Sequence, residues 1–357
     1  MVRDGEAISL STSPLDDFEA PRILPLNSTV TEQWEFDAVS DDGMSFFIFG
    51  FYRDPGLAIL GSGNLRISAE ITYANGTRYS QVDYPTDSIV EQCSEGTRGV
   101  WRTEEYSYSF EVTKDMSHAR IGVDTPDLRG NILMGSRMPP AYADGSAWPS
   151  TNATTSITPY FHWVAPIPAG TVNAELIVKD EPFTFTGMGG HNRLWSPFSW
   201  FTCLQAMNAV RTANGPYTLF YMSFTSNIKR EAVYQSVQLA KNGNLIFSTT
   251  NGQPSDTEDY VLMTKTYDGK VAGTLRDKVT GYELELVSPM TSKHYTFIVE
   301  HKNIAFEYIL GGGRGGSGFT ALSIGGPVGL EQTRGVAFTE ALNFPKRSPL
   351  FKVQYKE

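Results

Sequence analysis

The sequence predicts an all-β protein built from antiparallel strands. Apolar and polar residues alternate through most of the chain, helical periodicity is scarce, and glycine or asparagine turns separate the alternating runs. The chain has 357 residues, which is long for one β domain and suits two. Hydrophobic residues make up 40% and charged residues 19%, a balance that favours a globular chain over a disordered one.

The first strand signal carries several carboxylates. In TEQWEFD (31–37), alternation places Glu32 on one face with two aromatic residues, and Glu35 and Asp37 on the other. In one interpretation the second face is simply solvated. In the other, Glu32 faces inward beside Trp34 as a polar group of a pocket, where burial would require a hydrogen-bonding partner.

Further strand signals follow in order. FFIFGFY (46–52) is apolar on both faces, which indicates a strand with one face in the core and the other along a pocket. Residues 65–84 form two alternating runs about Asn75-Gly76, a dipeptide typical of hairpin turns. A second hairpin is predicted over 261–275, and other strands are predicted at 106–112, 174–180, 217–224, 244–250 and 294–310.

The middle of the chain sets the domain division. Residues 136–156 are rich in Pro, Ser, Thr and Gly, and we predict a long loop there within the first domain. The boundary is placed near 183–190, which gives an N-terminal domain over 1–186 and a C-terminal domain over 187–357. The second domain then holds enough strands to close a small barrel. Its best short helix candidate is 201–212.

The stretch GMGGHNRLWSPFSW (187–200) is unusual because it combines glycines, an arginine and two tryptophans without the spacing of any metal or nucleophile motif. Trp195 and Trp200 are five residues apart, so a regular strand would direct them to opposite faces, but Pro197 breaks that regularity. Two interpretations remain open. In one, Arg193 stacks on Trp195 or pairs with an acid. In the other, the segment forms the aromatic wall of a ligand site.

Other motifs give little support for familiar chemistry. The five histidines lack metal-ligand spacing, and no serine lies in a G-x-S-x-G elbow. GGGRGGSG (311–318) lacks the G-K-[ST] ending of a phosphate loop, so we predict a flexible loop between strands that could cover a pocket. No cofactor and no metal are expected.

Charge and cysteine content restrict the partners and the compartment. The formal net charge of −10 argues against nucleic acid as a partner. No apolar run approaches the ~20 residues of a membrane-spanning helix, and the first residues lack the apolar core of a secretory signal. Two cysteines, Cys93 and Cys203, exclude a disulfide framework and are expected to be reduced and buried. We therefore expect a cytoplasmic protein.

Several of these segments together resemble a known family, the fungal Diels–Alderases that form decalin rings on polyketide–tetramic-acid backbones. The specific element is GGHNRLWSPFSW (189–200), which is followed by Arg211-Thr212 and Gly215-Pro216-Tyr217. RDKVTGY (276–282) is similar to a D-K-x-T-G-Y turn, and EQWEFD (32–37) is similar to a W-x-F-D strand of that family. The matches span both halves of the chain.

The resemblance implies a fold of two lipocalin-like antiparallel β domains, a sandwich and a barrel. It also implies a cofactor-independent pericyclase that catalyses a stereoselective intramolecular [4+2] cycloaddition in polyketide–nonribosomal peptide biosynthesis. The expected substrate is a linear polyene tetramic acid and the expected product is a trans- or cis-decalin. Other enzymes of the same biosynthetic pathway are a further class of expected partner.

Candidate site residues follow from these interpretations. Glu32, Asn208 and Arg334 are the polar candidates, because a carboxyl, an amide and a guanidinium can each anchor or activate an acidic head group. The apolar and aromatic candidates for binding the substrate are Phe49, Tyr52, Trp195, Trp200 and Phe319.

Two alternative functions belong to other classes. A non-catalytic, lipocalin-like carrier of an apolar metabolite would need the same aromatic lining. A hetero-Diels–Alderase is the nearest enzyme alternative, and a relative of the hydroxyneurosporene synthase-type hydratases is another. The hydratase alternative is weakened because Asn192 stands near the position of the acid in those enzymes, and an amide cannot protonate an alkene.

Overall fold

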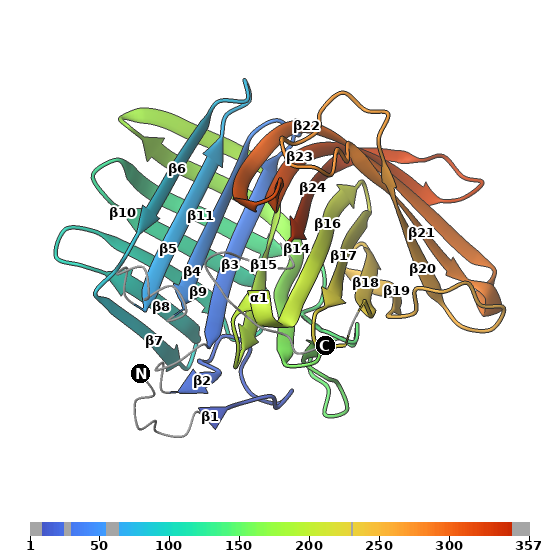
Figure 1. The fold of residues 1–357 in the computed structure, drawn as a ribbon, viewed down its shortest axis with the longest axis horizontal. Helices are drawn as coiled ribbons and strands as arrows, with labels where there is room; N and C mark the ends of the chain where they lie inside the picture. Colours follow the sequence, from blue (N-terminus) through green and yellow to red (C-terminus); the bar gives the residue numbers. More distant parts are fainter. Residues whose placement is uncertain (1–8, 25–29, 55–63, 230, 345–357) are drawn as a thin grey trace.

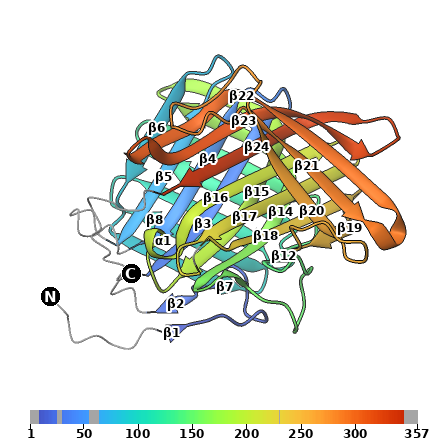
Figure 2. The ribbon, with the colours of Figure 1, turned by 45° about the vertical axis from the view of Figure 1, so that its right-hand side comes forward.

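The computed structural model describes residues 9–24, 30–54, 64–229 and 231–344. Two large sheets, both antiparallel throughout, make up nearly all of the structure, and they lie side by side in Figures 1 and 2. The all-β prediction is confirmed: one sheet forms a half-barrel and the other forms a nearly closed barrel, and the fold is lipocalin-like.

The half-barrel is the thirteen-stranded sheet, shown in blue and green on the left of Figure 1. Its strands are ordered β6 (Arg78–Asp83), β5 (Leu65–Thr72), β4 (Phe46–Arg53), β3 (Thr31–Ser40), β15 (Glu181–Ser196), β14 (Phe161–Val178), β11 (Leu128–Ser136), β10 (His118–Asp124), β9 (Ser107–Thr113), β8 (Gly96–Arg102) and β7 (Asp87–Cys93). Two short strands, β12 (Ala141–Tyr142) and β13 (Ser156–Thr158), also pair with β14. A separate small sheet joins β1 (Ser9–Leu10) to β2 (Ile23–Leu24).

The barrel is the nine-stranded sheet, shown in yellow to red on the right of Figure 1. Its strands are ordered β19 (Asn244–Thr249), β18 (Val233–Lys241), β17 (Tyr217–Ser226), β16 (Leu204–Asn214), β24 (Thr333–Asn343), β23 (Arg314–Pro327), β22 (Lys293–Gly311), β21 (Gly281–Ser288) and β20 (Tyr260–Thr266). A 3-10 turn, η2 (Pro289–Thr291), precedes β22. The edges meet through bonds such as Val261 N–H to the Asn251 carbonyl at 2.9 Å, so the sheet nearly closes.

A short helix, α1 (Trp200–Cys203), connects the two sheets. β15 runs through Ser196 and pairs with β3 and β14, so the half-barrel extends beyond residue 186. The division at 186/187 therefore falls inside β15, and the barrel begins with β16 at Leu204.

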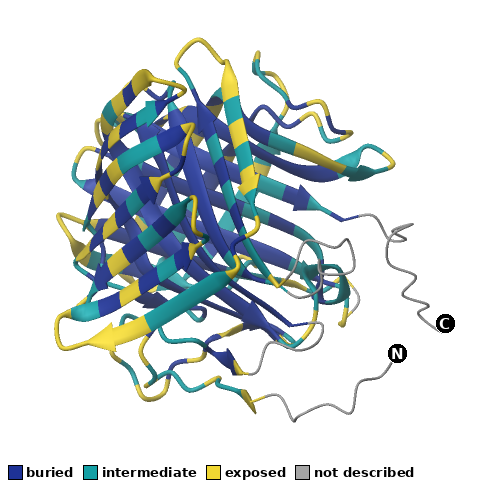
Figure 3. Cartoon of the chain, turned by 90° about the vertical axis from the view of Figure 1, so that its left-hand side faces the viewer, coloured by how far each residue is buried: buried dark blue, intermediate teal, exposed yellow. Residues whose placement is uncertain are grey.

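Alternation along the strands creates four clusters of packed apolar side chains. One fills the half-barrel, a second fills the barrel, and two lie between the sheets, the smaller of them around Phe46 and Phe306. Trp34 and Phe36 belong to the first cluster, whereas Met207 and Phe220 belong to the larger cluster between the sheets. In Figure 3, exposed and buried residues alternate along the outer strands of the half-barrel, as expected for strands with one solvated face.

Several local predictions can be compared with these elements. The hairpin about Asn75-Gly76 is confirmed by β5 and β6, with Gly76 at a φ of 82°. The helix predicted over 201–212 is wrong, because only α1 is helical and β16 follows it. The hairpin predicted over 261–275 is also wrong: β20 pairs with β21, and irregular chain separates them from 267 to 280.

The two cysteines are free, as expected, but only Cys203 is buried, so the prediction of burial is wrong for Cys93. None of the helices in the described ranges combines the length and apolar character of a membrane span. In the same ranges, no three His, Cys, Asp or Glu side chains gather in a way that would hold a metal ion.

The GGHNRLW motif holds the N-terminal segment against the half-barrel. Arg193 is fully buried and lies 3.7 Å over the Trp34 ring, and its Nε and Nη2 donate to the carbonyls of Phe18 and Ala20 at 3.1 and 2.8 Å. The same guanidinium pairs with Glu32 at 3.0 Å. The structure therefore confirms that Arg193 pairs with an acid. The predicted stacking on Trp195 is wrong, because the guanidinium stacks on Trp34 and Arg22 lies over Trp195.

Breaking this buried pair is expected to destabilise the fold. Arg193→Ala would leave the Glu32 carboxyl buried without its cation, which typically costs about 3–5 kcal/mol in the free energy of unfolding. Urea unfolding measures the loss. The control is Arg129→Ala, because Arg129 and Asp180 form an exposed pair at 2.9 Å and such pairs contribute about 0–1 kcal/mol. Equal losses in the two variants would contradict the assignment.

Candidate active site

A cavity of about 360 Å³ lies between the two sheets, within the size range of small-molecule sites. The half-barrel contributes residues from β3, β4, β5 and β6, and the barrel side contributes residues from β22, β24 and α1. Its lining residues are Gln33, Glu35, Ile48, Tyr52, Asp54, Arg66, Ser68, Glu70, Val82, Ser199, Trp200, Phe201, Phe306, Tyr308, Leu310, Glu340, Leu342 and Phe344. The site thus combines a largely apolar wall with a few charged groups.

The half-barrel wall follows from strand alternation. Trp34 and Phe36 point into the half-barrel, so the opposite face of β3 brings Glu35 to the cavity. On β4, the Tyr52 ring lies over Gly50, where an added Cβ would come within 2.4 Å of that ring. Gly50 is the cross-strand partner of Glu35, so the Tyr52 ring is placed beside that carboxyl.

The barrel wall uses the same packing twice. The rings of Phe306 and Tyr308 on β22 lie over Gly318 and Gly316 on β23, where an added Cβ would meet them at 2.3 and 2.4 Å. The prediction of a flexible loop over 311–318 is wrong for all but residues 312–313, because β22 ends at Gly311 and β23 begins at Arg314. Gly316 and Gly318 are required because a side chain there would displace the aromatic rings that line the cavity.

Trp200 closes the cavity from α1. Its ring packs edge-on against Phe161 at a centroid distance of 5.1 Å, and it is one of three residues shared with a small adjoining cavity. The other two shared residues are Glu35 and Glu340. The two spaces therefore meet at a pair of carboxyl groups, one from each sheet.

The carboxyl pair lies in a buried charged cluster. Glu35 comes from β3 and Glu340 from β24, and beside them Arg211 of β16 forms an ion pair with Asp37. Arg211 also donates from Nε to the Pro168 carbonyl at 2.7 Å. Three carboxyls thus share one guanidinium, which leaves two negative charges uncompensated if all three are ionised.

Burial and mutual repulsion raise the pKa values of this pair. Burial, followed by the negative charge of Asp37, raises the pKa of Glu35 to about 7, although Arg211, Asn192 and Gln33 oppose the shift. Burial and the charge of Glu35 raise the pKa of Glu340 well above its ordinary value. The pair therefore holds a proton at neutral pH, and a neutral carboxylic acid can donate a hydrogen bond into the cavity.

Two of the residues predicted from the sequence line the cavity, Tyr52 and Trp200. Glu32 is buried on the other face of β3, where its Oε1 accepts from Arg193 and from the Arg22 amide at 2.6 Å. Trp195 is buried in the core of the half-barrel and donates from Nε1 to the Ser11 carbonyl at 3.0 Å.

The remaining predicted residues lie outside the cavity lining. Phe49 is in the half-barrel core. Phe319 is buried, and its ring stacks on the His301 ring with 3.9 Å between the ring centroids. Asn208 donates to the Ser223 hydroxyl at 3.4 Å, and Arg334 is exposed on β24. The prediction that one face of 46–52 is core and the other lines a pocket is confirmed, with Tyr52 rather than Phe49 on the pocket side.

Sequence reasoning missed both acids of the pair. Glu35 was identifiable, because Gln33, Glu35 and Asp37 form a polar face on a strand whose opposite face holds Trp34 and Phe36. The sequence alone does not show whether this polar face is exposed to solvent or lines a site. The structure shows that the barrel covers it. The sequence around Glu340 contains no motif that indicates a site, and β24 comes near Glu35 only through the folding of distant segments.

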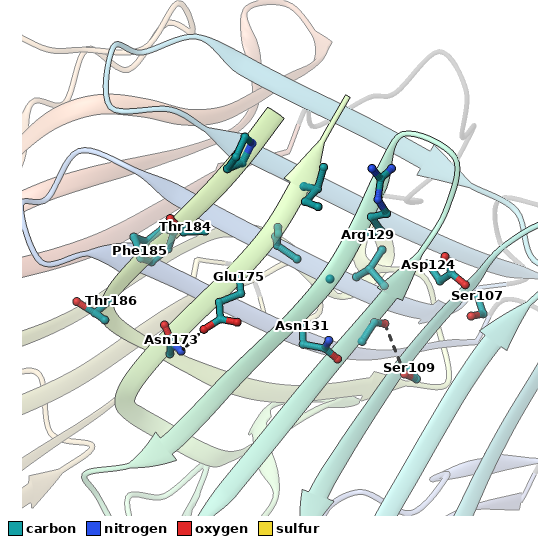
Figure 4. Close-up of a pocket in the computed structure, with 16 residues that line it drawn as sticks. Ser107, Ser109, Asp124, Arg129, Asn131, Asn173, Glu175, Thr184, Phe185 and Thr186 are labelled. Carbon is teal, nitrogen blue, oxygen red and sulfur yellow. Dashed lines mark hydrogen bonds between the residues drawn. The ribbon is translucent and has the colours of Figure 1, made fainter. Parts of the chain in front are cut away.

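A larger depression lies elsewhere, on the outer face of the half-barrel (Figure 4). Apart from Phe185, its labelled residues are polar side chains of β9, β10, β11, β14 and β15, including Asn131, Asn173 and Glu175, which are exposed. Asn173 donates to Glu175 at 3.1 Å, so these groups satisfy one another. Because this depression is open to solvent, it is less suited than the cavity between the sheets to enclosing a small molecule.

Comparison with known proteins identifies the family. The Diels-Alderase-like family matches residues 1–345. The chain belongs to this family. It is 57% identical over 358 residues to Diels-Alderase ffsF of Aspergillus flavipes, covering 100% of this chain and 87% of that protein. It is 55% identical to Diels-Alderase phmD of Phaeosphaeria nodorum over the full length of both chains.

A solved structure has a similar fold. The crystal structure of CghA with Sch210972 superposes with a TM-score of 0.77 at 26% sequence identity, covering 89% of each chain. Family membership and these relatives assign the chain as an enzyme, a pericyclase of the Diels-Alderase type. The cavity between the sheets is its candidate active site.

Gly318 provides a test of this site. Gly318→Ala would push the Phe306 ring toward the cavity, so we expect a changed ratio of product stereoisomers, with a stability cost of about 1–3 kcal/mol. The matched control is Gly99→Ala, where an added Cβ would meet the Phe110 ring at the same 2.3 Å, but in the half-barrel core. Chiral chromatography of the products decides: an unchanged ratio in Gly318→Ala would place the site elsewhere.

Proposed function

We propose that this pericyclase binds a linear polyene tetramic acid in the cavity between its sheets and forms a decalin by an intramolecular [4+2] cycloaddition, without a cofactor. Family membership supports the cycloaddition. The apolar wall, from Ile48 and Trp200 to Phe306 and Phe344, suits a polyene. The observation that carries the proposal is a buried carboxyl pair, Glu35 and Glu340, at the end of that wall.

The reaction needs little covalent help from the protein. Three π bonds become one while two σ bonds form, and no atom or electron is gained or lost. A tether already joins diene and dienophile, so the cavity contributes by selecting one folded conformer. The aromatic rings of Phe306 and Tyr308 are held over glycines, which gives the wall a defined shape for that selection.

The carboxyl pair supplies electronic activation. A carbonyl conjugated with the dienophile gains negative charge in the transition state, and a hydrogen bond to its oxygen then strengthens. A protonated Glu35 or Glu340 is a suitable donor, because burial and the neighbouring acids favour its neutral form. Gln33 donates to Glu35 and holds that side chain in place.

Glu340 and the pH profile test this activation. Glu340→Ala is expected to lower kcat by about 10–100-fold, the effect of losing roughly 1.4–2.7 kcal/mol of transition-state stabilisation. In the wild type, kcat is expected to be highest at low pH and to fall as pH rises through about 7, because only the protonated acid donates. Glu340→Gln keeps an N–H donor and should show a flatter profile.

The control for this test is Glu175→Gln, since Glu175 lies on the outer face of the half-barrel. Its rate and pH profile should match the wild type. A Glu340→Ala enzyme with wild-type kcat and an unchanged profile would contradict a role for the acid pair.

The function itself is tested with purified protein and a synthetic linear polyene tetramic acid. One decalin diastereomer is expected, formed faster than in buffer and without added metal or nucleotide. Binding without any change in rate or product ratio would instead indicate a carrier. A cycloadduct whose new cyclohexene closes a larger ring would overturn the decalin assignment and retain the cycloaddition.

A further inference from the structure

We propose that Arg66 is the anion-binding residue of the cavity and holds the ionised head group of the substrate. This inference rests on the proposed function, because it assigns the polar contacts of the same site. It adds the residue that would recognise this head group, whose anion is delocalised over two oxygens of an enolised 1,3-dicarbonyl ring.

The position of Arg66 supports this role. On β5 it is the cross-strand partner of Tyr52, and its guanidinium lies 3.6 Å over that ring. Its ion pair with Asp54 is long, with 3.8 Å between Nη2 and Oδ2. Its Nε is buried and has no hydrogen-bond partner. A guanidinium thus stands in the cavity wall with donor capacity still available.

The charge of the lining gives Arg66 a distinct place. Among the described residues that line the cavity it is the one basic side chain, whereas Glu35, Asp54, Glu70 and Glu340 are acidic. An anionic ligand would be repelled by ionised carboxyls, so it needs a cation at its charged oxygen. Arg66 supplies that charge, and the stacked Tyr52 ring limits the number of side-chain conformers that binding must fix.

Tyr52 lies between the Arg66 guanidinium and Glu35, so one bound head group could contact both. The Tyr52 ring contacts the Arg66 guanidinium, lies over Gly50 beside Glu35, and carries a hydroxyl that accepts from Ser68 at 3.4 Å. A flat ring beside Tyr52 can present one oxygen to Arg66 and another to the protonated acid. The arrangement would fix which end of the polyene faces the apolar wall.

Arg66 takes the role that the sequence suggested for Arg334. A guanidinium at position 334 is exposed on β24 and lies outside the cavity lining, whereas the Arg66 side chain is 21% exposed and lines it. Both arginines have the same chemistry. Only their positions relative to the cavity distinguish them.

The experiment compares two probes that differ in charge. 3-Acetyl tetramic acid is an anion at neutral pH, and its 4-O-methyl ether has a similar shape but cannot ionise. Their dissociation constants are measured by quenching of tryptophan fluorescence and checked by calorimetry, for the wild type, Arg66→Gln, Arg66→Lys and the control Arg334→Gln. Thermal unfolding confirms that each variant is folded.

We expect Arg66→Gln to weaken binding of the anionic probe by about 10- to 100-fold, as for a lost hydrogen-bonded charge, and to change binding of the ether less than about twofold. Arg66→Lys should recover part of the loss, and Arg334→Gln should match the wild type. Equal weakening of both probes, or none, would overturn the inference. If Arg66→Gln binds the anion normally and the wild type still cyclises the polyene, only the role of Arg66 fails. If the wild type cyclises no polyene, the proposed function fails.

Discussion

The buried ion pair between Arg211 and Asp37 is the contact on which the site depends. It joins β16 of the barrel to β3 of the half-barrel, and a second bond from Arg211 to the Pro168 carbonyl adds a further tie to the first sheet. Such a pair stabilises little by itself, because desolvation offsets most of its attraction. Its contribution is to position the two sheets relative to each other, so that Glu35 of β3 and Glu340 of β24 line the same cavity.

That constraint also determines the electrostatics. One guanidinium is already committed to Asp37, so it cannot neutralise the other two acids as well. Burial then raises the pKa of both Glu35 and Glu340, and a proton stays on the pair. In a pericyclic reaction, which needs no nucleophile, a neutral acid in an apolar cavity is a sufficient polar group.

The sequence predicted the fold class because alternation is a local signal, and β4 shows how far such a signal extends. It predicted correctly that Tyr52 and Phe49 lie on opposite faces, but the pocket face could not be identified without the second sheet. Glu32 and Arg193 were both noticed as unusual, and they proved to satisfy each other inside the half-barrel. Glu340, Phe306 and Tyr308 were not predicted, since they reach the cavity only through long-range pairing.

Glycine links the sequence to the shape of the cavity. Gly50, Gly316 and Gly318 each leave space for an aromatic ring from a neighbouring position, and the three rings face the cavity from both sheets. Glycine destabilises a strand, because it has no side chain to pack and loses more backbone entropy on folding than other residues. Its recurrence at these positions therefore indicates another role. Here that role is to let aromatic rings of the cavity wall pack directly against the strand backbone, which restricts their movement. A wall of this kind can distinguish folded conformers of a flexible polyene, because a ring that cannot move toward the strand cannot adapt to the wrong conformer.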